Sequence, residues 1–126
     1  MPGITNQSMT LQLAGNNVTI NVAYTAIFSA FDRFLAQNGL RFRERIRVIG
    51  EDPGTATDRI LHTFPVETIS VTSGTIPRNR SLTVTRNSLQ EDVGSDDDEI
   101  DCTIEIIPVD LPAVVTATTP QQVLAG

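Results

Sequence analysis

The chain has 126 residues, of which 40% are hydrophobic and 19% charged. This composition fits one globular domain with its own core and excludes an intrinsically disordered chain. The net charge of −6 argues against general affinity for nucleic acids or anionic membranes. The single cysteine, Cys102, excludes an internal disulfide framework and a cysteine-based zinc cluster.

The sequence has no feature that directs it to a membrane. No apolar run reaches the roughly 18–20 residues that a membrane-spanning helix needs. The first ten residues, MPGITNQSMT, have neither a basic start nor an apolar stretch, so we expect no secretory signal peptide. We therefore expect cytoplasmic synthesis, with incorporation into a particle left open.

The N-terminal third of the chain changes its hydrophobic period once. Residues 9–13 and 17–24 alternate apolar and polar side chains around an Ala-Gly-Asn turn, which predicts a β-hairpin. Residues 25–38 have helical spacing, which predicts an amphipathic helix with Thr25 as its N-cap and Asn38-Gly39 as its end. The apolar face of this helix, expected to fill the core, consists of Ile27, Phe28, Phe31, Phe34 and Leu35.

Beyond the helix, the period returns to that of strands. Strands are predicted at residues 40–49, 58–72 with a bend at Pro65, 81–86, 100–106 and 113–118, with a turn at 74–79. About seven short strands and one helix favour a mainly β (α+β) fold, an antiparallel β-sandwich or roll with the helix packed on it. Residues 1–126 then form a single β-rich domain, in which 1–8 and 112–126 are extended arms.

Two charged features of the sequence are complementary. Arg41, Arg43, Arg45 and Arg47, called here the arginine row, occupy every second position of a predicted strand. They would line one face of that strand over about 20 Å, opposite an apolar face that only Glu44 interrupts. Residues 91–101, EDVGSDDDEID, called here the acidic segment, hold seven of the fifteen carboxylates.

Neighbouring arginines on one strand face repel each other unless anions balance them. The anions could be the chain's own carboxylates, an acidic partner or a phosphate-bearing ligand. Nucleic acid is disfavoured, because aromatic residues for base stacking make up only 5% of the chain and Trp is absent. An exposed face that merely carries solvated arginines is the plainest alternative.

The acidic segment has two interpretations besides pairing with arginines. Carboxylates in a loop between strands can supply oxygen ligands to Ca²⁺, and the metal ligands would be Asp92, Asp96, Asp98 and Glu99. The EF-hand spacing is missing, however. A solvated loop that keeps the protein soluble and blocks strand pairing explains the same composition.

Catalytic chemistry has little support in the sequence. His62 alternates with Ile60 and Phe64, which indicates a packed or edge histidine, and Cys102 alternates with Ile100 and Ile104, which indicates a core residue. No nucleophile elbow, Walker loop, HExxH motif or Rossmann glycine run is present. The chain is therefore predicted to be no enzyme and to need no cofactor.

The sequence thus leads to two main functional hypotheses, with a small hydrolase as a weaker third. The first is a non-catalytic structural subunit of a virion, phage tail or surface assembly, which forms homo-oligomers or joins other subunits of an assembly. In this hypothesis the arginine row binds carboxylates of a neighbouring copy, chiefly Asp96, Asp97, Asp98 and Glu99. The alternative is a Ca²⁺-dependent ligand-binding β-sandwich module with the metal in the acidic segment.

Overall fold

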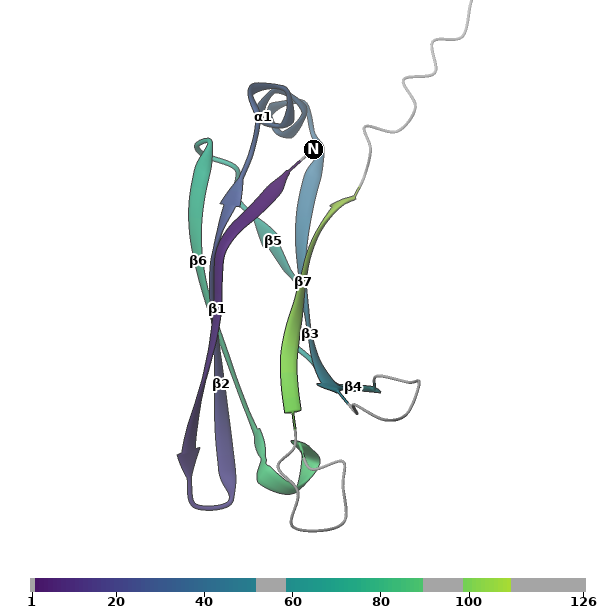
Figure 1. The fold of residues 1–126 in the computed structure, drawn as a ribbon. Coiled ribbons are helices and arrows are strands. Elements are labelled where there is room, and N and C mark those ends of the chain that lie inside the picture. Colours follow the sequence, from purple (N-terminus) through teal and green to yellow (C-terminus); the bar gives the residue numbers. More distant parts are fainter. Residues whose placement is uncertain (1, 52–58, 90–98, 110–126) are drawn as a thin grey trace, which may run out of the picture.

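The computed structural model describes residues 2–51, 59–89 and 99–109, which fold into two facing antiparallel sheets with one helix at an end (Figure 1). The first sheet has the order β1 (Gly3–Ala14), β2 (Asn17–Ile27) and β6 (Thr75–Thr85). The second contains β3 (Arg41–Glu51), β4 (Arg59–Thr63), β5 (Glu67–Ile69) and β7 (Glu99–Val109). The helix α1 (Ala30–Gln37) links the sheets, and a 3₁₀ turn, η1 (Arg86–Leu89), follows β6. The predicted antiparallel sandwich is confirmed.

The first sheet is built on the predicted hairpin. β1 and β2 pair from Gly3↔Ile27 to Ala14↔Asn17, and Gly15 provides the positive φ of 63° that the turn requires. The residues assigned to an N-terminal arm therefore lie, from Gly3 onward, in β1. The strand has one irregularity, between Thr5 and Ser8, before its regular pairing resumes.

β6 differs most from its predicted extent. It pairs with β2 from Ile27↔Thr75 to Asn17↔Thr85, so the strand begins where a turn was predicted from Gly74 to Asn79. Pro77 suggested that turn. It is compatible with the strand because β6 is an edge strand of its sheet, where a missing backbone N–H need not break the sheet.

β3 is the central strand of the second sheet. Along one edge it pairs with β7, from Arg41↔Val109 to Glu51↔Glu99. Along the other edge β5 pairs with residues 42–44 and β4 with residues 47–50. The predicted run 58–72 is thus two short strands with the expected bend at Pro65 between them. The strand predicted at 113–118 lies outside the described residues.

The core lies between the sheets and comes from the inward positions of the strands. Its largest fully buried apolar side chains are Phe42, Phe64, Ile20, Ile46, Val22 and Val48. Each such side chain contributes about 1.5–3 kcal/mol through burial. Phe28 joins this core, with its ring 5.1 Å from that of Phe42.

The helix differs from its prediction in start and in role. β2 continues to Ile27, so Thr25 is a strand residue, and Ser29 caps the helix in a reciprocal capping box with Asp32. Asn38 and Gly39 end it as predicted.

The expectation that the apolar face of the helix fills the core holds only for Phe28, which precedes the helix, and for Leu35, which packs against the core. Phe31 and Phe34 are 64% and 57% exposed and stack on each other at 6.5 Å. The predicted helix included residues 25–28. Residues 25–27 instead pair with the neighbouring strands, and Phe28 packs in the core, so these residues lie outside the helix.

Candidate functional site

The arginine row lies on the outer face of the second sheet. β3 alternates strictly: Phe42, Glu44, Ile46 and Val48 are buried between the sheets, and the four arginines point the other way. Arg41 is exposed, and Arg43, Arg45 and Arg47 are half-buried. The structure therefore brings together the four predicted interaction residues of β3.

The residues beside the row contribute little negative charge. The cross-strand partners of Arg43, Arg45 and Arg47 on β7 are Ile107, Glu105 and Thr103. On the opposite edge, Thr63 of β4 lies beside Arg47 and Thr68 of β5 beside Arg43. Among these five neighbours, Glu105 is the only carboxylate.

Glu105 pairs with one arginine of the row. Arg45 Nη2 donates to Glu105 Oε2 at 2.7 Å. This hydrogen bond, together with the charges of Arg45 and Arg47, lowers the pKa of the Glu105 carboxyl against a small opposing effect of burial. Because both side chains are about one-third exposed, the pair adds at most about 1 kcal/mol to stability.

The other arginines leave charge available on this face. Arg41 also takes part in an interaction, but Arg43 and Arg47 form no hydrogen bond or ion pair with any described residue. The Nε of Arg45 is buried without a hydrogen-bond partner in the same part of the chain. The face therefore combines positive charge with unused hydrogen-bond donors.

Most of the acidic segment lies outside the described residues, including Asp92, Asp96, Asp97 and Asp98. Glu99 begins β7 and is paired with Glu51 at the end of β3. Within the described residues, no three metal-ligating side chains come together. The metal site predicted at Asp92, Asp96, Asp98 and Glu99 remains a prediction.

The structure also contains a charged cluster between the sheets that the sequence did not lead us to predict. It consists of Glu44 on β3, Tyr24 on β2, Arg78 and Arg80 on β6, and Glu67 on β5. Glu44 is 0% exposed and accepts hydrogen bonds from the Tyr24 hydroxyl, from Arg80 and, at 2.9 Å, from Arg78 Nε.

The rest of the cluster completes the pairing of its arginines. Arg78 Nη2 donates to Glu67 Oε1 at 2.7 Å, and Arg80 Nη2 donates to the Pro65 carbonyl at 2.8 Å. The Arg80 guanidinium also lies over the Phe64 ring, 5.9 Å from its centre. Two arginines and two glutamates leave the cluster neutral.

The pKa shifts in the cluster follow from this geometry. Burial by itself raises the pKa of Glu44, but hydrogen bonds from Arg78, Tyr24 and Arg80 and the charge of Arg78 outweigh it and hold the pKa below its ordinary value. Burial and the adjacent Glu44 raise the pKa of the Tyr24 phenol. The cluster is therefore charged at Glu44 and neutral at Tyr24 over the physiological pH range.

A sequence signal for this cluster exists. Glu44 interrupts the apolar face of β3. On β6, Arg78 and Arg80 occupy every second position together with the apolar residues Ile76, Leu82 and Val84, so all five share one strand face. A carboxylate buried at the centre of a sheet needs cationic partners from the facing sheet. The predicted turn at residues 74–79 included Arg78, and the strand predicted from residue 81 left out Arg80, whereas both lie in β6.

His62 and Cys102 have structural surroundings. His62 Nε2 lies 2.7 Å from Ser88 Oγ, which ties β4 to η1. Cys102 is half-buried, with its Sγ 3.3 Å from Met9 Sδ. Burial, with the charge of Asp101, raises the pKa of its thiol to about 11, so the thiol stays protonated and unreactive at neutral pH.

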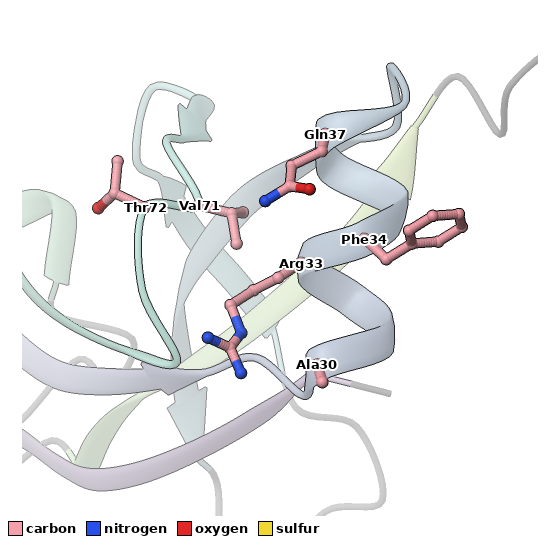
Figure 2. A pocket seen from close by; sticks show the side chains of 6 residues that line it. All are labelled: Ala30, Arg33, Phe34, Gln37, Val71 and Thr72. Carbon is pink, nitrogen blue, oxygen red and sulfur yellow. The ribbon is translucent and has the colours of Figure 1, made fainter.

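A surface hollow of about 320 Å³ lies between α1 and the segment after β5 (Figure 2). Ala30, Arg33, Phe34 and Gln37 of the helix line it, with Val71 and Thr72 opposite. Figure 2 shows the Phe34 ring directed away from Val71 and Thr72. Arg33 is the only titratable side chain in this lining, so the hollow offers no pair of groups for acid–base or nucleophilic catalysis.

Comparison of the chain with protein-family models, curated proteins and solved structures finds no match. Across the residues that the structure describes, no helix has the length and apolar character to cross a membrane.

Proposed function

We propose that this protein is a non-catalytic structural subunit that self-associates, with the arginine row of one copy bound to the acidic segment of another. Such subunits build virions, phage tails and surface assemblies. The observation that carries the proposal is the outer face of the second sheet, where four aligned arginines have one bonded carboxylate among their cross-strand neighbours.

The chemistry of this face favours carboxylates over other anions. The cross-strand neighbours of the row include no aromatic ring on which a nucleic-acid base could stack. An extended acidic peptide instead matches a flat row of arginine forks about 20 Å long.

Chain geometry favours a second copy as the source of that peptide. Residues 90–98 are held between Leu89 and Glu99, and Glu99 is paired with the last residue of β3. A nine-residue connection that leaves and returns at one end of the sandwich extends at most about 17 Å. Arg43 lies eight residues before Glu51, about 27 Å along the strand. The chain's own segment can thus reach Arg47 but not the whole row.

The test is the light-scattering mass of the full chain after size exclusion at low and high salt. We expect particles at low salt that dissociate in high salt, because exposed ion pairs are screened. Arg43→Glu with Arg47→Glu should no longer form the salt-sensitive particles. The control, Arg33→Glu with Arg86→Glu, changes the net charge equally but lies outside the row, and it should still assemble.

Mixing two variants identifies the surfaces that meet. Asp97→Arg with Asp98→Arg should not assemble alone, but should form particles when mixed with the Arg43→Glu, Arg47→Glu variant, because the charges are then exchanged between partners. A wild-type monomer in every salt condition would refute the proposal. Particles that require Ca²⁺ and disappear with chelator would instead support the metal-binding alternative.

A further inference from the structure

The free edge of β1 is a long strand edge whose regular part carries neither charge nor proline, whereas the edge that β4 and β5 form beside β3 consists of strands of only five and three residues. The opposite edge of its sheet, β6, has inward-pointing Arg78 and Arg80 and carries Pro77. The β7 edge carries Asp101 and Glu105 and has Pro108 near its end. After its irregularity at residues 5–8, β1 continues as SMTLQLA, without charge or proline.

The side chains of this run leave apolar surface uncovered. Leu11 and Leu13 pair with Ile20 and Val18, so they face the second sheet, yet they are 41% and 62% exposed. Beside them, a hollow of about 180 Å³ opens between β1 and β7, lined mainly by Gln7, Ser8, Met9, Asp101, Cys102 and Ile104. The sandwich is thus open along the seam between these two strands.

A segment of this chain has the composition that fits such an edge. The first charged residue of the chain is Asp32 and the last is Asp110, so β1 and residues 111–126 share an uncharged character. Residues 113–119, AVVTATT, are rich in β-branched side chains and match the seven-residue run of β1 in length. An uncharged strand placed there would add main-chain hydrogen bonds and cover Leu11 and Leu13.

The direction of the chain decides which copy supplies this segment. Val109 pairs with Arg41, and Gly3 pairs with Ile27, so β7 ends and β1 begins at the α1 end of the sandwich (Figure 1). A strand continuing from Val109 along β1 of the same chain would therefore run parallel to it. All five strand pairings between the described strands are antiparallel, and parallel pairs are slightly weaker.

We infer that the edge of β1, from Ser8 to Ala14, binds residues 113–119 of a second copy as an added antiparallel strand. This contact is apolar and made by main-chain hydrogen bonds. It does not depend on the arginine row and should persist in high salt.

The test uses two full-length variants in which Cys102→Ser removes the native thiol. One carries Thr10→Cys on the outer face of β1, and the other carries Thr116→Cys. The two are mixed in 1 M salt and treated with a short bismaleimide, and mass spectrometry measures the mixed dimer. The matched control replaces Thr10→Cys by Thr83→Cys, which lies on the same sheet face but on the β6 strand.

The mixed dimer with Thr10→Cys should exceed the Thr83→Cys control on the order of tenfold, because pairing raises the local thiol concentration. Adding Val115→Asp should abolish the excess without changing the melting temperature. Equal yields with both partners would overturn the inference. A variant that carries both Thr10→Cys and Thr116→Cys and cross-links only within one chain would also overturn the inference. If a partner with Phe34→Cys gives a higher yield of mixed dimer than the partner with Thr10→Cys, the segment binds on α1 and the inference is refuted.

Discussion

The protein carries two sets of arginines at alternate positions of a strand, and their surroundings are opposite. The arginine row on β3 points to solvent, and Arg43 and Arg47 have no bonded partner among the described residues. Arg78 and Arg80 on β6 point between the sheets and converge on the fully buried Glu44. Arginines at alternate strand positions are therefore found in two different environments, and the face of the sheet on which they lie determines which environment they have.

The difference between the two sets is energetic. In the charged cluster, each charge has lost water and depends on its partners, so removing one leaves another buried and uncompensated. In the row, the side chains are exposed or half-buried, so an individual pair such as Arg45 with Glu105 contributes little to folding. One set links the two sheets, and the other is the surface that we propose for binding.

The largest expected effect comes from removing the centre of the cluster. Glu44→Gln should lower the free energy of unfolding by about 3–5 kcal/mol, because Arg78 and Arg80 then lack their buried counter-charge. Urea denaturation at pH 7 measures this. The control, Glu105→Gln, breaks the half-exposed pair with Arg45 and should cost about 1 kcal/mol or less. Equal losses in the two variants would contradict the contrast between cluster and row.

Acid should affect the cluster through the lowered pKa of Glu44. A carboxyl whose pKa is lower in the folded than in the unfolded state stabilises the fold above its unfolded pKa, about 4.3. That contribution is lost as the pH falls through the folded pKa. We therefore expect a steep loss of stability below about pH 4 in the wild type. Urea midpoints between pH 6 and 3 should fall less in Glu44→Gln; identical curves would exclude Glu44 as the cause.

The smallest effect on folding should come from the row itself. Arg43→Ala with Arg47→Ala should change the free energy of unfolding by no more than about 0.5 kcal/mol, because neither side chain has a bonded partner among the described residues. The thermal melt of the dilute monomer measures this. A large loss would mean that the row supports the fold itself, which would weaken its assignment as a binding surface.

The alternation of apolar and polar residues along the sequence was sufficient to predict much of the fold. The alternation of β2, β3 and β7 and the turn at Gly15 predicted the hairpin, the strand faces and the direction of the arginine row. These features depend on side chains two positions apart and on one backbone conformation, and both are encoded locally. The bend at Pro65 was also predicted from a local signal, although the same signal was misleading at Pro77, which lies within β6.

What the sequence by itself determined is which residues share a strand face, and therefore that four arginines stand together. Only the tertiary structure decided which faces are covered. Phe31 and Phe34 are exposed although their spacing predicted a core-facing helix, and Arg78 and Arg80 are buried because β6 pairs with β2 past Pro77. Burial depends on contacts between residues distant in the chain, such as Glu44 and Arg80, and no local pattern specifies these.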